Sequence, residues 1–191
     1  MSSPDLKQII QRAKRRDNEA ISTLYEMYAD LIYRYIAYRV PTTSDAEDLT
    51  AEVFVNMLDS LPKYQDTGAP FEAWLYRIAA ARVADFHRKA SRRPQTELSD
   101  TLKADTPQPE DQLQEQQEFQ TLRNALAQLN DEQQQVLILR FVERKSHQEV
   151  ADIIGKSLSA VRSIQHRALI ELGRHLGSDE KIRHYLRGRS S

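Results

Sequence analysis

The chain has 191 residues, carries 27 basic and 28 acidic side chains for a net charge of −1, and contains no cysteine. This length suits one domain or two small ones. Because cysteine is missing, disulfides, thiolate zinc sites and iron–sulfur clusters are excluded. The 5 glycines form no nucleotide-binding fingerprint and the 5 histidines form no HExxH pattern. We therefore expect neither an enzyme nor a protein that holds a metal or another cofactor.

The sequence has no feature of a membrane or secreted protein. Its apolar runs fall well short of the roughly 20 residues that a membrane-spanning helix needs. The first ten residues, MSSPDLKQII, lack the charged and then apolar segments of a signal peptide. We expect a soluble cytoplasmic protein.

Charge is distributed unevenly along the chain. Residues 1–93 are nearly neutral, whereas residues 94–118 contain 1 basic and 7 acidic residues and residues 119–191 contain 12 basic and 8 acidic residues. The acidic segment also holds three prolines and a run of glutamine without apolar periodicity, so it cannot bury enough apolar surface to fold alone. The sequence therefore predicts an all-α protein of two small helical domains, 1–93 and 119–191, joined by a flexible acidic linker, 94–118.

Three helices are expected in the first domain. Apolar residues recur at spacings of three and four between residues 21 and 36, with Asp17 as the N-cap. A second helix opens at Ser44, where Glu47 completes a capping box. A loop over residues 62–70 then leads to a helix over residues 71–88. Together these segments predict a bundle of three or four helices.

The second domain contains several helix boundary signals. One helix ends near Leu129, and Asn130 can cap the next. Ser146 and Glu149 form a capping box, Gly155 supplies a left-handed stop, and Ser157 can cap a long final helix. The last residues form a short basic tail, to which we assign no function.

The stretch SHQEVADIIGKSLSAVRSIQHRAL, residues 146–169, predicts a helix-turn-helix. If the apolar residues of its second helix face inward, Ser159, Arg162, Ser163 and His166 point outward together. Such a helix fits the major groove of DNA, where arginine forms bidentate hydrogen bonds with guanine. Arg167 is better placed for phosphate contacts, which fix register without reading sequence. The alternative is an ordinary helical hairpin with a solvated basic face.

A second basic stretch occupies residues 71–93. Residues 77–93 contain six basic side chains and one acidic side chain. The basic ones include Arg77, Arg82 and Arg88. Lys63 and Tyr64 precede it in the loop. Aromatic rings beside a basic track suit single-stranded nucleic acid, because bases stack on rings while cations follow the backbone. The alternative, that aromatic residues of this helix are core, is the stronger one for Trp74 and Phe86.

The stretch DAEDLTAEVFVNML, residues 45–58, has an acidic exposed face. Glu47, Asp48, Glu52 and Asn56 share it. An acidic surface repels DNA, so its partner should be a basic protein surface. On its own the pattern is more typical of a solvated face.

Taken together, these segments resemble the extracytoplasmic-function (ECF) group of the sigma-70 family, the promoter-specificity subunits of bacterial RNA polymerase. DAEDLTAEVF resembles the family's core-binding helix, which implies that Asp48, Leu49, Glu52 and Val53 contact the clamp coiled coil of core RNA polymerase. FEAWLYRIAAARVADFHR is similar to the helix for the minus-ten element, and the loop before it to the loop that captures an unstacked base. The second domain resembles the reader of the minus-thirty-five element.

This resemblance implies the partners. They are core RNA polymerase, promoter DNA and an anti-sigma protein, and we expect a monomer when the protein is free. Two alternatives remain open at this point. An autonomous helix-turn-helix repressor or activator would bind a symmetric operator tightly without polymerase. A general single-strand binding protein would show no sequence preference and strong salt dependence.

Overall fold

The computed structural model describes residues 3–93 and 110–177, and in this part of the chain all regular structure is helical. The helices are α1 (Ser3–Lys14), α2 (Asn18–Ala37), α3 (Thr43–Ser60), η1 (Leu61–Lys63), α4 (Phe71–Arg92), α5 (Glu110–Leu126), α6 (Asp131–Leu137), η2 (Ile138–Val142), α7 (His147–Ile154) and α8 (Leu158–Leu176). The predicted all-α class is confirmed. Within the described ranges, every helix is too short or too polar to span a bilayer.

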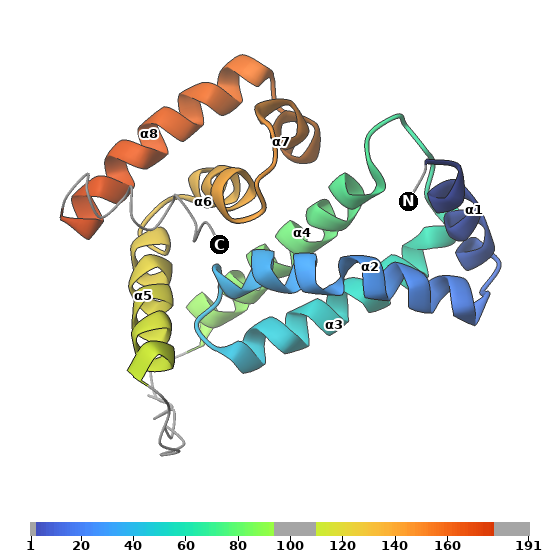
Figure 1. Ribbon diagram of the computed structural model, residues 1–191, viewed down its shortest axis with the longest axis horizontal. Helices are drawn as coiled ribbons and strands as arrows, with labels where there is room; N and C mark the ends of the chain where they lie inside the picture. Colours follow the sequence, from blue (N-terminus) through green and yellow to red (C-terminus); the bar gives the residue numbers. More distant parts are fainter. Residues whose placement is uncertain (1–2, 94–109, 178–191) are drawn as a thin grey trace.

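Helices α2, α3 and α4 form the amino-terminal bundle, and α1 packs at one end of it (Figure 1). Asp17 caps α2 as predicted, because its side chain accepts hydrogen bonds from the amides of Glu19 and Ala20. The predicted start of α3 is wrong. The Thr42 side chain caps it by accepting from the Asp45 amide, so the helix begins before Ser44.

Two helices extend beyond the predicted segments. α4 continues to Arg92 rather than ending at residue 88. α5 begins at Glu110, so the last part of the segment predicted as a flexible linker, residues 110–118, is helical. The rest of that segment, 94–109, and the basic tail from residue 178 lie outside the described residues.

The carboxy-terminal unit contains the predicted helix-turn-helix. Asn130 and Gln133 form a capping box at the start of α6, and Ser146 and Glu149 form another at the start of α7. α7 ends at Gly155, whose φ of 69° is left-handed and unfavourable for a residue with a side chain. Ser157 then caps α8 by accepting from the Ala160 amide. The local signals in this unit therefore specify its turn.

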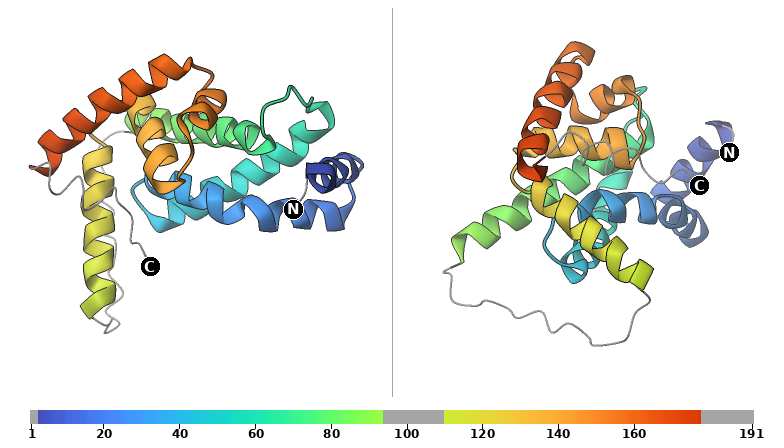
Figure 2. Two further views of the ribbon diagram at one scale, coloured as in Figure 1. Left: turned by 45° about the horizontal axis from the view of Figure 1, so that its top comes forward. Right: turned by 60° about the vertical axis from the view of Figure 1, so that its left-hand side comes forward.

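The two units pack against each other. η2 and α7 lie against α2 and α4, so helices α6–α8 gather on one side of the amino-terminal bundle, while α1 and α5 occupy opposite ends of the molecule (Figures 1 and 2). Buried apolar side chains of the two units belong to one hydrophobic cluster, so the two cores are continuous. The sequence predicts two domains and gives no indication of this docking.

Polar side chains connect the two units at four places, which we call the domain interface. Its amino-terminal side consists of Arg34, Arg39, Glu72 and Arg77. Its carboxy-terminal side consists of Glu143, Asp131, Lys145 and the carbonyl groups of Asp152 and Ile153. The interface is more polar than the interior of either unit, which is typical of contacts between domains of one chain.

Glu143 and Arg39 are the most buried charged groups of the domain interface. Arg34 forms a bidentate pair with Glu143, with Nε–Oε1 and Nη2–Oε2 distances of 3.1 and 3.0 Å, and the Glu143 side chain is only 1% exposed. This pairing raises the pKa of Arg34. Arg39 is fully buried, pairs with Asp131 and donates to the Tyr35 hydroxyl at 2.7 Å. Charges buried to this degree require their partners, so these pairs fix how the units dock.

Candidate nucleic-acid interface

The outward face of α8 is the first part of the candidate site. Its five predicted DNA contacts are exposed: Ser159, Arg162, Ser163, His166 and Arg167. Their spacing places them along one side of the helix, and Val161, Ile164 and Ala168 on the other side are buried. Within the described residues, no hydrogen bond or ion pair occupies the Arg162 side chain, whereas Arg167 Nε lies 3.4 Å from the Ser163 carbonyl. The face is therefore free to meet another molecule.

Arg140 links the parts of the helix-turn-helix. Its Nε donates to Gln165 Oε1 of α8 at 3.1 Å, and its Nη1 donates to the Lys145 carbonyl just before α7. The guanidinium thus ties α8 to the segment that starts α7. This role of Arg140 is not predictable from the sequence, because its position in η2 gives no sign of a contact 25 residues away.

The loop before α4 holds the second part of the site. Lys63 is exposed at the end of η1, and Tyr64, the next residue, is half-buried. The Tyr64 ring lies 5.2 Å from the ring of Phe71 and 4.7 Å from that of Trp74, and burial raises the pKa of its hydroxyl. Lys63, Tyr64, Trp74 and Arg77 line a shallow groove of about 250 Å³. The Tyr64 ring is therefore restrained by its neighbours and not free in solvent.

The three predicted arginines of α4 already have partners. Arg77 donates from Nε and Nη2 to the carbonyls of Ile153 and Asp152, at 3.0 and 2.7 Å. Arg82 pairs with Asp85 at 2.5 Å, and Arg88 pairs with the same carboxylate. The Arg88 side chain is exposed, and that of Arg82 is half-buried. Arg77 is bound by the last carbonyl groups of α7, a C-terminal helix end that attracts cations.

The four core contacts implied for α3 divide into two pairs. Asp48 and Glu52 are exposed, as expected. Leu49 and Val53 are 5% and 0% exposed, because the same heptad spacing that carries the acidic face turns them into the bundle. Their side chains pack beneath the acidic face in this structure, and their contact with core RNA polymerase stays a prediction.

Two exposed apolar residues lie beside the acidic face of α3, and the sequence did not predict either as a contact with a protein partner. Val55 is 58% exposed on α3, and Tyr25 of α2 is 51% exposed, with its ring 4.8 Å from that of Phe54. Tyrosine is one of the residue types that are enriched in protein-binding surfaces. The apolar periodicity of α2 predicted Tyr25 as core, so the sequence pattern concealed its exposure.

An exposed helix-turn-helix face, a basic helix beside a groove with aromatic walls, and an acidic helix with apolar neighbours define a helical nucleic-acid-binding protein with a protein-docking surface. Comparisons with known proteins specify this class further. The family model for sigma-70 region 2 matches residues 24–93, and the model for sigma-70 region 4 matches residues 125–172.

Curated relatives match over most of the chain. The ECF RNA polymerase sigma factor BldN of Streptomyces coelicolor is 34% identical over 94% of this chain and 69% of its own length. SigD of Mycobacterium tuberculosis, another ECF sigma factor, is 35% identical over 90% of this chain and 84% of its own length. The RNA polymerase sigma factor YlaC of Bacillus subtilis is 34% identical over 85% of this chain and 94% of its own length.

Solved structures support the fold. CnrH, in complex with the cytosolic domain of CnrY, superposes with a TM-score of 0.69 at 21% identity, covering 90% of this chain and 96% of CnrH. RpoE of Bartonella quintana, in complex with the anti-sigma factor NepR, gives a TM-score of 0.62 at 20% identity over 83% of this chain and 97% of RpoE. The chain belongs to the ECF group of the sigma-70 family, and it is an RNA polymerase sigma factor.

Proposed function

We propose that the two units divide promoter recognition between them. The exposed face of α8 reads the minus-thirty-five element in the major groove through Ser159, Arg162, Ser163 and His166, with Arg167 on a phosphate. Lys63, Tyr64, Arg77, Arg82 and Arg88 hold the separated strand of the minus-ten element. The chain contributes binding and has no catalytic activity of its own.

We further propose that α3 docks on core RNA polymerase. Asp48 and Glu52 face a basic surface of the clamp coiled coil, and Tyr25 and Val55 add apolar contact at the edge. A net charge of −1 is unfavourable for tight binding of free DNA, so the polymerase has to supply much of the affinity by holding both units at the promoter.

The observation that carries this proposal is the exposed face of α8 on a capped, buried scaffold. Four side chains with hydrogen-bonding groups project from consecutive turns, and the opposite side of the helix is core. The capping motifs of α7 and α8 and the left-handed Gly155 fix the angle at which α8 leaves α7, so this face projects as a rigid surface.

Run-off transcription with purified core enzyme tests the proposal. We expect the chain to direct initiation at specific sites in a library of DNA fragments, and to give little specific duplex binding in a gel shift without polymerase. Glu52→Lys should abolish association with core enzyme while the helical content stays unchanged. Specific, tight binding of duplex DNA by the free chain would instead favour an autonomous repressor or activator.

We also propose that an anti-sigma protein covers these surfaces, acting in the cytoplasm on the free monomer. The proposal is supported by the RpoE structure named above, in which a member of the family is bound to an anti-sigma factor. Competition between such a protein and core enzyme for the chain, measured by co-purification, tests it. Independent binding of both to one chain would contradict it.

A further inference from the structure

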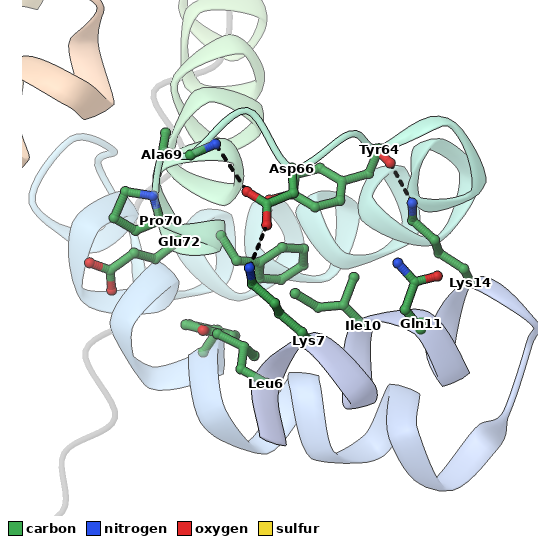
Figure 3. A pocket seen from close by; sticks show the side chains of 13 residues that line it. Leu6, Lys7, Ile10, Gln11, Lys14, Tyr64, Asp66, Ala69, Pro70 and Glu72 are labelled. Atoms are coloured by element: carbon green, nitrogen blue, oxygen red, sulfur yellow. Dashed lines mark hydrogen bonds and ion pairs between the residues drawn. The ribbon is translucent and has the colours of Figure 1, made fainter. Parts of the chain in front are cut away.

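Helix α1 and the loop over residues 64–70 face each other across a cavity of about 550 Å³ (Figure 3). Apolar side chains line its interior: Leu6, Ile10, Tyr28 and Phe71. Two lysines of α1 extend from the helix to the loop. Lys7 Nζ lies 3.4 Å from Asp66 Oδ2, and Lys14 Nζ donates to the Tyr64 carbonyl at 2.5 Å. The lysines are seven residues apart, which is about two helical turns, so both project from one face.

The loop has few other attachments. Residues 65–68 are exposed and bury little surface, and Asp66 Oδ1 accepts from the Gly68 amide within the loop itself. Within the described residues, the side chains of other helices that hydrogen bond or ion pair with this loop are those of Lys7 and Lys14. α1 therefore supplies polar side-chain contacts to this loop, and the packing of the Tyr64 ring on Phe71 and Trp74 of α4 supplies its aromatic contacts.

The two lysine contacts differ in strength. The Lys7 and Asp66 side chains are 72% and 51% exposed, and an ion pair in that setting stabilises little. Lys14 is half-buried and forms a charge-assisted hydrogen bond. Its Nζ also lies 5.6 Å from the centroid of the Tyr64 ring, within the range of a cation–π contact. One ammonium group thus holds both the backbone and the ring of Tyr64.

We propose that Lys14 is a positioning residue for promoter opening, which fixes the Tyr64 ring in the orientation that receives an unstacked base. This inference rests on the proposed function of Tyr64. It extends that function to α1, which precedes the segment matched by the family model, residues 24–93. Lys14 acts through Tyr64 and makes no contact with DNA itself.

The fluorescence of Trp74 gives a test that does not involve DNA. Trp74 is the single tryptophan of the chain, and its ring lies 4.7 Å from that of Tyr64. Lys14→Met keeps the aliphatic stem and removes the charge, so we expect a shifted Trp74 emission and faster quenching by acrylamide. Lys14→Arg should retain the normal signal, as should the control Arg15→Met, which changes an exposed neighbour. Unchanged Trp74 emission and quenching in Lys14→Met overturn the proposal.

The opening rate of the holoenzyme gives the second test. A 2-aminopurine base in the minus-ten element reports opening. We expect Lys14→Met to slow it about fivefold to tenfold, with normal assembly on core enzyme and with recovery in Lys14→Arg. If Lys14 acts through Tyr64, then Tyr64→Ala combined with Lys14→Met should be no slower than Tyr64→Ala alone.

If the opening rate of the double variant falls by the product of the two single-variant losses, Lys14 acts independently of Tyr64 and the proposal is overturned.

A separate result would overturn the underlying function of Tyr64. If Tyr64→Ala opens promoters at the normal rate, then the role of Tyr64 is wrong, whatever the Trp74 signal of Lys14→Met shows.

Discussion

Arg162 and Arg174 lie on the same helix and carry the same charge, but their surroundings differ. Arg162 is exposed without an ion pair in the described residues, and Arg174 pairs with Glu171 at 2.9 Å near the end of α8. We expect Arg162→Ala to relax the preference for one base of the minus-thirty-five element by about 1–3 kcal/mol. Arg174→Ala should cause a small loss on every sequence. Transcription from a set of single-base promoter variants distinguishes the two substitutions. If Arg162→Ala reduced transcription equally from all promoter variants, Arg162 would be a phosphate contact.

Glu149 gives a prediction about pH. Its carboxylate accepts a hydrogen bond from the Ser146 amide at 2.6 Å, and this bond, together with the Ser146 side chain, lowers the pKa of Glu149 from 4.5. A lowered pKa in the folded state means stability that is present above pH 4.5 and is lost as the pH falls through the folded value. Glu149→Gln should therefore lower Tm slightly at pH 7, and the two Tm values should converge as the pH falls from 4.5 through the lowered folded pKa of Glu149. A constant difference across this range in thermal melts would contradict the prediction.

Residue-level prediction from sequence succeeds where helical periodicity decides the outcome. The five α8 residues are exposed as expected, because one side of a 3.6-residue repeat is apolar and the other is not. Leu49 and Val53 were assigned from a family motif, which marks a segment without distinguishing its buried side from its exposed side. The contacts of Arg77 could not be predicted, for another reason. Its partners are main-chain carbonyls of α7, and no pattern of side chains encodes such partners.

At the scale of elements, the turn between α7 and α8 depends on one glycine. Gly155 has a φ of 69°, and a Cβ added there meets nothing within 4 Å, so only the backbone conformation opposes a larger residue. Gly155→Ala should lower the free energy of unfolding by about 1–2 kcal/mol, with a smaller loss for Gly155→Asn. Gly177, with a φ of 78° after α8, is the matched control. Both alanine variants should lose stability in urea titrations, but only Gly155→Ala should weaken recognition of the minus-thirty-five element.

Strong cap signals made α2, α6, α7 and α8 predictable. α1 was not predicted although Leu6, Ile9, Ile10 and Ala13 recur at helical spacing, and the first half of α5 has no such repeat. In α1 only Ile10 and Ala13 are buried among the residues with described side chains, and the first half of α5 is exposed. α5 instead rests on the bundle through Phe119, whose ring lies 4.7 Å from that of Tyr38. The buried apolar residues of α5, Leu122, Ala125 and Leu126, lie in its last turns, so the composition of residues 110–118 suggested a linker.

At the scale of the whole molecule, the domain interface depends on charge pairs. Arg34→Glu would place a second carboxylate beside the buried Glu143, so docking of the two units should weaken by about 1–3 kcal/mol. Because the chain contains no cysteine, labels on Asp59→Cys and Ile170→Cys would be specific, and energy transfer between them should fall in this variant. Combining it with Glu143→Arg should restore part of the transfer, whereas Arg15→Glu should leave it unchanged. Equal transfer in all variants would show that these charges do not hold the units together.

The sequence could not predict this docking. Each partner is separated from the other by many residues, 109 for Arg34 and Glu143 and 92 for Arg39 and Asp131, and the charges involved look like ordinary surface charges in their own helices. Arg39 is buried where the two units meet, and it pairs there with Asp131 of the second unit. Local propensity fixes the helices, but the arrangement of the two units depends on contacts that the chain makes after both have formed.

The contact between α4 and α7 limits how much of a promoter one chain spans. Duplex DNA rises about 3.4 Å per base pair, so elements centred about 25 base pairs apart are separated by roughly 85 Å along the axis. In the docked arrangement, Arg77 of α4 donates to the carbonyls of Ile153 and Asp152 at the end of α7. Under the proposed division of promoter recognition, one chain reads both elements at once only if the two units part, and we expect Arg77 then to exchange two carbonyl oxygens for a nucleic-acid backbone.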